Sequence, residues 1–296
     1  MKNLINLIEA GFFILLSLPI ALLPHWFALK AGEILGLIVF YIWRSRRKIA
    51  IENIEKSAEH SRSECSARMV AKETFRNLGK SFAEVIKIYY GFGKGIINNI
   101  EIRGVENYHR AKSKNKGVII ITGHCGNWEL MALAFGFRID NVSGVARMQN
   151  NPYLNMLVEK IRAKYGNNVI YKKGALKSIL LELRKNKGVG ILIDQATLKD
   201  EGLIINFLGR PAWTTKMPAL IARKTGAPVL PIFIHRDNRE VDRHIISIYP
   251  EIALSAEDDI DKAIIEDTKR FSEFIENYIK EHPSEWLWIH RRWKRT

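Results

Sequence analysis

The sequence contains little cysteine and no motif typical of a metal site. Among its 296 residues there are only two cysteines, Cys65 and Cys125. A disulfide framework is therefore not expected, and a reducing, cytoplasm-facing environment is the simpler interpretation. The 8 histidines are scattered, with no His-Glu-x-x-His motif and no paired cysteines, so we expect no metal site.

Acidic residues are also under-represented. Asp and Glu together number 31 against 46 Lys and Arg, which gives a formal net charge of +15. Such a surface attracts phosphates, anionic lipid head groups, acidic proteins or nucleic acid. The basic clusters flank apolar or aromatic stretches at both ends of the chain, and no recognised nucleic-acid module is visible. We therefore expect no nucleic-acid partner and favour a membrane surface.

The amino-terminal region has very few charges. Between residues 4 and 23 the only charged residue is Glu9, and residues 26–43 carry only Lys30 and Glu33. A bilayer core of ~30 Å needs ~20 apolar residues as helix, so the first segment can just span and the second can span or lie along the interface. We expect residues 1–43 to form a membrane anchor or interfacial helices, and residues 44–296 to form one catalytic domain.

A basic cluster follows this region directly, at Arg44, Arg46, Arg47 and Lys48. Basic residues after an apolar stretch tend to stay in the cytoplasm, which places the following domain there. A cleaved signal peptide fits less well, because the apolar region is too long and the basic cluster lies on the wrong side. The alternative is a buried helical hairpin of a soluble protein.

Beyond residue 44 apolar strands alternate with amphipathic helices. This alternation predicts an α/β fold with a mixed, largely parallel central sheet flanked by helices. The strand candidates are residues 117–122, 169–172, 189–193, 229–235 and 244–249, and the helix candidates are residues 65–90, 152–165, 174–186, 214–225 and 258–279.

Chemistry is concentrated in the segment Gly123-His124-Cys125-Gly126-Asn127-Trp128-Glu129, directly after the first buried strand. Asn127 can cap a helix that begins at Trp128. If the chain turns into helix there, Glu129 can fold back and orient the His124 ring, which then serves as a general base for a hydroxyl. The alternative for His124 is a structural role.

The sequence has no Gly-x-Ser-x-Gly nucleophile elbow, so a covalent intermediate on a serine is not expected, and direct attack by the hydroxyl is favoured. Cys125 is the obvious alternative nucleophile. Its position is explained equally by a small buried residue at a turn, and we favour that interpretation.

Five ordered segments resemble the lipid A biosynthesis lauroyl/myristoyl acyltransferases, relatives of the glycerolipid acyltransferases. The first is the His-x4-Glu block from His124 to Glu129. The others are Arg147 with Asn150 and Asn151, then Arg162 ahead of Gly166; Asp194-Gln195; residues 207–215 continuing into 225–231; and residues 283–294. The resemblance covers essentially the whole chain.

This resemblance implies an enzyme on the cytoplasmic face of the bacterial inner membrane. It implies transfer of a fatty acyl group from acyl carrier protein, as co-substrate and partner, to a hydroxyl of a phosphorylated lipid A precursor, with no cofactor. One departure is Met217, where family members often carry Gly. Because that helix start is expected to line the acyl channel, Met217 leaves the chain length of the donor open.

Charge and shape suggest roles for the other matched residues. Arg147 and Arg162 are candidates for holding a lipid phosphate or the developing oxyanion, since guanidinium forms bidentate bonds. The alternative for each is a surface salt bridge. Asp194 can orient an arginine or a histidine from the neighbouring strand end, or only cap a turn. Asn127 and Thr214 are further binding candidates, and Thr214 is also expected to cap the next helix.

Three alternatives stay open at this point. The acceptor can be another lipid, such as a lysophospholipid, an ornithine lipid or a mannosylated phosphoinositide. The chain can be a silent membrane scaffold, although an oriented base has no use there. The tail residues Trp286, Trp288 and Trp293 suit either a membrane interface or the protein core.

Overall fold

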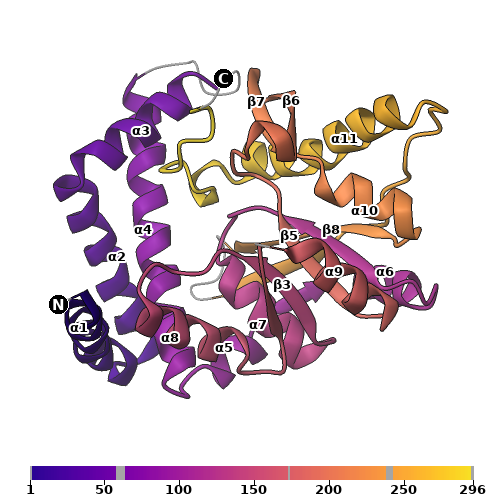
Figure 1. The fold of residues 1–296 in the computed structure, drawn as a ribbon. Helices are drawn as coiled ribbons and strands as arrows, with labels where there is room; N and C mark the ends of the chain where they lie inside the picture. Colours follow the sequence, from indigo (N-terminus) through magenta and orange to yellow (C-terminus); the bar gives the residue numbers. More distant parts are fainter. Residues whose placement is uncertain (1, 58–63, 173, 238–242, 295–296) are drawn as a thin grey trace.

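The computed structural model describes residues 2–57, 64–172, 174–237 and 243–294. Four helices come first: α1 (Lys2–Leu22), α2 (His25–Ile42), α3 (Arg44–Glu55) and α4 (Glu64–Tyr89). They stand together on one side of the molecule, beside the central sheet (Figure 1). Both α1 and α2 are long and apolar enough to cross a membrane, judged by length and composition. Their large apolar side chains are widely exposed, as at Leu15, Leu22 and Ile42, which suggests association with a membrane.

Helix α2 packs backbone to backbone on α4. A Cβ added at Gly32 would lie 2.4 Å from the carbonyl oxygen of Gly79, and one added at Gly36 would lie 2.1 Å from that of Phe75. Any larger residue at these positions would push the two helices apart. The glycines of α2 therefore fix this helix directly against α4.

The central sheet has seven strands in the order β1-β9-β8-β2-β5-β3-β4. All neighbours pair in parallel except β8 and β9. The strands are β1 (Glu101–Arg103), β2 (Val118–Thr122), β3 (Val142–Ala146), β4 (Asn168–Tyr171), β5 (Gly188–Leu192), β8 (Val229–Arg236) and β9 (His244–Ile248). The expected mixed, largely parallel sheet is confirmed.

Helices cover both faces of this sheet, and β2 is buried throughout. Its residues alternate between two cores, as a strand with period two requires. Val118 and Ile120 pack with α5 (Lys94–Asn98), α6 (Val105–Lys112) and α7 (Trp128–Arg138). Ile119 and Ile121 pack with α9 (Ala175–Arg184), α10 (Met217–Thr225) and α11 (Ile260–Glu281). Helix α8 (Pro152–Arg162) connects β3 to β4.

A separate hairpin, β6 (Gly202–Phe207) and β7 (Arg210–Thr215), precedes α10. It lies between the short helix η1 (Lys199–Glu201) and α10, and η2 (Pro283–Glu285) follows α11. The helix predicted from residue 214 therefore begins only at Met217, because Thr214 pairs with Leu203 in the hairpin.

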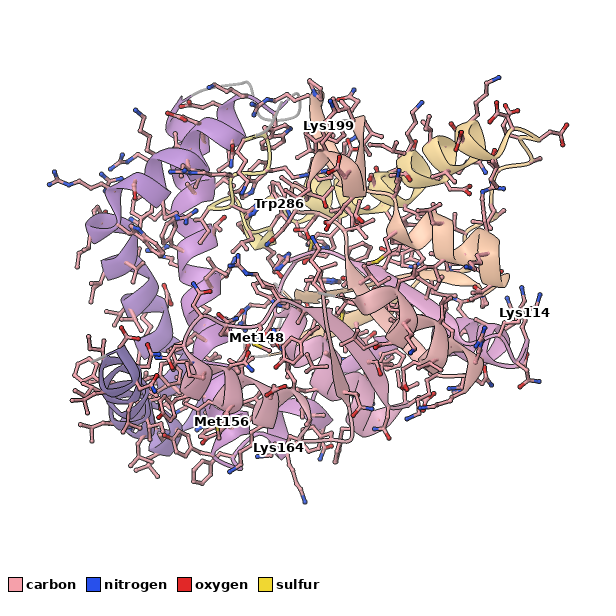
Figure 2. All side chains as sticks on the ribbon, viewed as in Figure 1. Lys114, Met148, Met156, Lys164, Lys199 and Trp286 are labelled. Atoms are coloured by element: carbon pink, nitrogen blue, oxygen red, sulfur yellow. The ribbon has the colours of Figure 1, made fainter. Side chains whose placement is uncertain are left out.

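The tail tryptophans belong to the core. Trp286, Trp288 and Trp293 are 1%, 0% and 7% exposed. Figure 2 shows Trp286 in the interior, whereas Lys114, Lys164 and Lys199 lie at the periphery. The membrane-interface alternative for these three side chains is therefore wrong.

Candidate active site

The site forms where two neighbouring parallel strands end. Thr122 at the end of β2 is in register with Leu192 at the end of β5. His124 follows the first strand and Asp194 follows the second, so the pairing brings together two residues that are 70 positions apart. Gly123, just before His124, is tightly enclosed, since an added Cβ would lie 2.9 Å from Sγ of Cys125 and 3.3 Å from the Asp194 side chain.

The carboxylate that bonds the His124 ring is Asp194. Its Oδ1 lies 2.8 Å from Nδ1 of His124, and its Oδ2 accepts the backbone N–H of His124 at 3.0 Å. The indole N–H of Trp286 donates to the same Oδ2 at 2.9 Å. The expectation that Glu129 bonds the imidazole is therefore incorrect for this structure, and the alternative stated for Asp194, that it orients a histidine, describes the observed contact.

The two ring nitrogens of His124 have different partners. The amide nitrogen of Gln195 lies 3.1 Å from Nε2. Because an amide N–H can only donate, Nε2 accepts in this contact and the proton of the neutral ring sits on Nδ1, facing Asp194. The arrangement fixes the tautomer that leaves a basic lone pair on Nε2.

Asp194 is 2% exposed, and it is nevertheless held as a carboxylate. Burial alone would raise its pKa, but the opposing effects of the His124 charge, the His124 hydrogen bonds and the Trp286 indole lower the pKa of Asp194 to about 2. Hydrogen bonds to the ionised form favour it in this way. Asp194 is therefore a permanent anion at neutral pH and stabilises a proton taken up by His124.

Glu129 lies in the first turn of α7, which begins after the Asn127 cap. Its side chain is directed to α8, where both of its oxygens are held by Arg162. The guanidinium Nε donates to Oε2 at 3.0 Å, and Nη2 donates to Oε1. Burial alone would lower the pKa of Arg162, but the bond and charge of Glu129 raise it. Arg162 is thus a fixed cation in the site.

A cavity of about 380 Å³ opens beside these groups. Its polar end includes His124, Glu129, Arg147, Arg162 and Gln195. Apolar side chains from α7 and from the sheet line much of the remainder, among them Ile120, Met131, Phe135, Val142 and Ile232, together with the polar Asn167 and Asn168. The structure therefore brings four of the residues predicted from the sequence to one cavity, with Asp194 directly behind His124.

Two further predicted binding residues, Asn127 and Thr214, do not line this cavity. Asn127 is 3% exposed; its oxygen caps α7 through the N–H of Leu130, and its amide donates to Glu84 at 2.7 Å. Thr214 is completely buried in β7 and accepts a bond from Arg292. Both side chains are used within the protein, which corrects the expectation that they contact substrate and that Thr214 caps α10.

Glu84 of α4 holds the segment from His124 to Glu129 in place through Asn127. It is completely buried in α4 and accepts both Nη1 and Nη2 of Arg236, each at 2.8 Å, in addition to Asn127. The ring of His244 also lies 2.8 Å from Glu84. Burial would raise the pKa of Glu84, yet Arg236 and His244 together hold it well below its usual value. The ionised Glu84 carboxylate therefore connects α4 to the turn after His124.

Cys125 is 1% exposed, and its surroundings do not suit a nucleophile. Burial, followed by the negative charges of Asp194 and Glu285, raises the pKa of its thiol well above the ordinary value. A thiolate is the reactive form of cysteine, so these surroundings suppress reactivity. The buried small-residue interpretation of Cys125 is the one that the structure supports.

Sequence reasoning missed Gln195 and Trp286 as site residues. Gln195 was adjacent to Asp194 in a matched segment, so its position at the same strand end was a usable signal. Trp286 also lies in a matched segment, residues 283–294, but nothing local connects it to Asp194, because their contact joins residues 92 positions apart. Met217 lines the cavity, as expected for the start of its helix. Within the described ranges, no group of three or more His, Cys, Asp or Glu side chains is arranged to hold a metal.

An α/β sheet with an oriented histidine at its strand ends, beside a cavity of acyl-chain size, is typical of an acyltransferase, and comparison with known proteins agrees. The model for bacterial lipid A biosynthesis acyltransferases matches residues 4–295. The chain therefore belongs to this family and is an acyltransferase.

Individual relatives are distant. The lipid A biosynthesis palmitoleoyltransferase of Escherichia coli is 24% identical over 276 residues, covering 92% of this chain and 86% of that protein. The lauroyltransferase of the same organism is 24% identical over 274 residues, covering 92% of this chain and 87% of that protein. A phosphatidylinositol mannoside acyltransferase of Mycobacterium tuberculosis is 23% identical over 195 residues, covering 65% of this chain and 59% of that protein.

Among solved structures, the 1-acyl-sn-glycerophosphate acyltransferase of Thermotoga maritima aligns with a TM-score of 0.37 at 17% identity. The alignment covers 92% of this chain and 98% of that chain.

Proposed function

We propose that this enzyme transfers a fatty acyl chain from acyl carrier protein to a hydroxyl of a lipid A precursor, with His124 as the general base and Asp194 as the residue that orients it. The observation that carries the proposal is the Nδ1 bond of His124 to a buried, ionised Asp194, with Nε2 at the cavity. Membership of the family supports acyl transfer to a lipid; the donor and the acceptor are part of the proposal.

The reaction follows from this geometry. The acceptor hydroxyl bonds Nε2 of His124 in place of the Gln195 amide and loses its proton as its oxygen attacks the thioester carbonyl. The negative charge of the tetrahedral intermediate is stabilised by a nearby cation or N–H donor. Its collapse breaks the carbon–sulfur bond, and the imidazolium, stabilised by Asp194, returns the proton to the leaving thiolate.

Arg162 and Arg147 supply positive charge at the polar end of the cavity. Arg162 is positioned by Glu129 through two bonds, so its planar group is held in one orientation. In this proposal Glu129 contributes by positioning Arg162, and Arg162 holds the oxyanion or an acceptor phosphate. Arg147 adds a second contact for an anionic head group.

The net charge of +15 suits an acidic carrier protein, and docking should weaken with added salt. The basic cluster at the start of α3, directly after the two apolar helices, favours the cytoplasmic face of a bacterial inner membrane. We therefore place the reaction at that face, with α1 and α2 as the anchor.

A second acceptor class is a mannosylated phosphoinositide, which is favoured by the similarity to the mycobacterial enzyme. Lysophospholipids and ornithine lipids are further alternative acceptors. Each would use the same base and the same cavity, so these alternatives change the acceptor and leave the chemistry as proposed.

The test is an acyl-transfer assay with purified protein, acyl carrier protein thioesters and a tetra-acylated lipid A precursor. Loss of a general base costs ~10²–10⁴ in rate, so His124→Ala and Asp194→Asn should both collapse turnover. The control is Glu257→Gln, an exposed acid outside the cavity. Transfer only to a mannosylated phosphoinositide or a lysophospholipid would replace the acceptor. Full biological activity of His124→Ala would instead favour a non-catalytic scaffold.

A further inference from the structure

Two neighbouring strands each present a glycine to the apolar part of the cavity. Gly144 on β3 and Gly190 on β5 are paired in register, and both line the cavity. A Cβ added at either glycine would meet no heavy atom within 4 Å. Because Ile120 is the partner of Gly190 on β2, the three positions lie on one face of the sheet.

The open space above Gly144 and Gly190 does not extend to Gly188. Gly188 lies two residues before Gly190 and therefore on the same face. A Cβ at Gly188 would lie 2.8 Å from Cγ1 of Val142 and 3.2 Å from the Tyr108 hydroxyl. Val142 is 7% exposed and Tyr108 is completely buried, so these side chains fill the space over β5 at this level, while Val142 and, on β4, Asn168 still line the cavity beside it.

The result is a groove between the sheet and α7. Met131 and Phe135 of α7 form its apolar wall opposite the glycines, and Ile120 and Ile232 extend the apolar lining. The polar end, with His124, lies at the carboxyl ends of β2 and β5. Measured along β5, the step from Leu192 to Gly188 is about 13 Å at ~3.3 Å per residue.

We propose that this groove binds the linear acyl chain of the donor thioester, and that the missing side chains of Gly144 and Gly190 set the chain lengths it accepts. This inference rests on the proposed function. An apolar groove beside His124 fits a chain that enters tail first and leaves its carbonyl at that residue. The acceptor is a branched lipid with its hydroxyl in the middle, and it fits the open polar end instead.

The size of the groove agrees with this occupant. An apolar cavity of ~150 Å³ in a protein core accommodates benzene. The cavity here is about 380 Å³, including its polar end. It therefore has room for a long hydrocarbon chain, whereas an acetyl group would leave most of it empty.

The experiment adds side chains of increasing size at the two glycines, with Gly190→Ala, Gly190→Val, Gly144→Ala and Gly144→Val. Neither glycine has a positive φ, so the new residues fit the strand conformation. Transfer is measured with carrier-protein thioesters from octanoyl to stearoyl. Each methylene that no longer fits should cost roughly fourfold in kcat/KM. We expect the ratio of long-donor to short-donor rates to fall at least ~10-fold in the valine variants, with smaller shifts in the alanine variants.

The matched control is Gly95→Val. Gly95 lies in α5, is exposed, and an added Cβ there also meets no heavy atom within 4 Å. Its length profile should equal that of the wild type. The opposite change, Val142→Ala, enlarges the groove near Gly188 and should shift the preference to longer donors. If the valine variants lower all rates by one common factor, the glycines do not set chain length and the inference is overturned.

Binding separates this inference from the proposed reaction. In a His124→Ala background, binding of acyl-pantetheine thioesters is followed by the fluorescence of Trp128, which lines the cavity 5.0 Å from the His124 ring. A length limit that shortens with Gly190→Val supports the groove even if the wild type transfers no acyl chain to any lipid. Binding that does not depend on chain length, or a limit that neither glycine variant changes, overturns it. Thermal melting by circular dichroism verifies that each variant is folded.

Discussion

Trp286 donates its indole N–H to one oxygen of Asp194, while the other oxygen of that carboxylate bonds the His124 ring. The carboxyl-terminal tail thus completes the site, because it supplies a hydrogen bond that keeps Asp194 both ionised and oriented. The main chain supports the same contact, since the N–H of Leu287 donates to the carbonyl of His124.

Replacing Trp286 by Phe should lower both activity and stability. The ring is largely preserved, but a hydrogen bond to a charged group, typically worth ~1.5–3 kcal/mol, is lost. Trp288→Phe is the matched control, because Trp288 is equally buried and donates to the carbonyl of Pro283. Both variants should melt earlier in calorimetry, and only Trp286→Phe should also lower kcat by ~10-fold or more. Equal kcat losses would contradict a specific role for Trp286.

Acid should destabilise the protein through Asp194. The pKa of this carboxyl is about 2 in the folded protein, below its ordinary value of 3.8. A depressed folded-state pKa contributes stability that is present above the unfolded value and lost as the pH falls through the folded value. We therefore expect a loss between about pH 4 and pH 2. The measurement is the denaturant midpoint of wild type and Asp194→Asn across this range.

The Asn variant lacks the titrating carboxyl, so its midpoint should fall less steeply than that of the wild type. Other acids titrate in both proteins, which is why the difference between them is the informative quantity. Parallel curves would mean that Asp194 is not the depressed group.

Glu129 and Arg162 should act as a unit. Removing either partner leaves the other without its two bonds, so Glu129→Gln, Arg162→Ala and the double variant should give non-additive losses of kcat/KM. Contacting residues show interaction energies of ~0.5–3 kcal/mol in such cycles. A parallel cycle between Glu129 and Asp194, which do not share a bond in this structure, should be closer to additive. If Glu129 couples to His124 and Asp194 as strongly as to Arg162, it takes part in orienting the base.

A lysine on the outer face of α1 should weaken membrane association. Leu15 is 68% exposed, and a charged residue at the centre of a membrane helix costs ~2.5–3.5 kcal/mol. The control is Ile260→Lys, which introduces the same charge at a side chain 56% exposed at the start of α11. Flotation with liposomes should show a smaller bound fraction for Leu15→Lys only. Unchanged flotation of both variants would argue against membrane contact at this face of α1.

Most of the sheet could be predicted from the sequence, because β2, β5, β8 and β9 are rich in Val, Ile and Leu. The strand β3 was not predicted: its segment contains Ser143 and Gly144, and the glycine gives no apolar signal. Its place in the sheet comes from pairing with β5. The hairpin that contains Thr214 was also missed, since its residues read locally as the start of a helix.

Most residues of the site were predicted from the sequence, but the carboxylate that bonds the His124 ring was not. His124, Arg147, Arg162 and Glu129 meet at one cavity, as their matched segments suggested. The bond to the imidazole was assigned to Glu129 because it is five positions away in sequence. The Asn127 cap and the helix from Trp128 are as predicted, but this helix directs Glu129 to Arg162 of α8, while the register of β2 with β5 brings Asp194 to the ring. Local spacing carries no information about such a register.

Helix α4 has a consequence for where the reaction can take place. One of its faces touches the backbone of α2 through Gly79, and one turn further on Glu84 holds Asn127 beside the catalytic histidine. A single rigid element therefore sets the height of His124 relative to α2. A lipid acceptor that lies in the same layer as α2 meets His124 at a constant depth. The position of the hydroxyl along that lipid therefore determines whether the hydroxyl reaches the base.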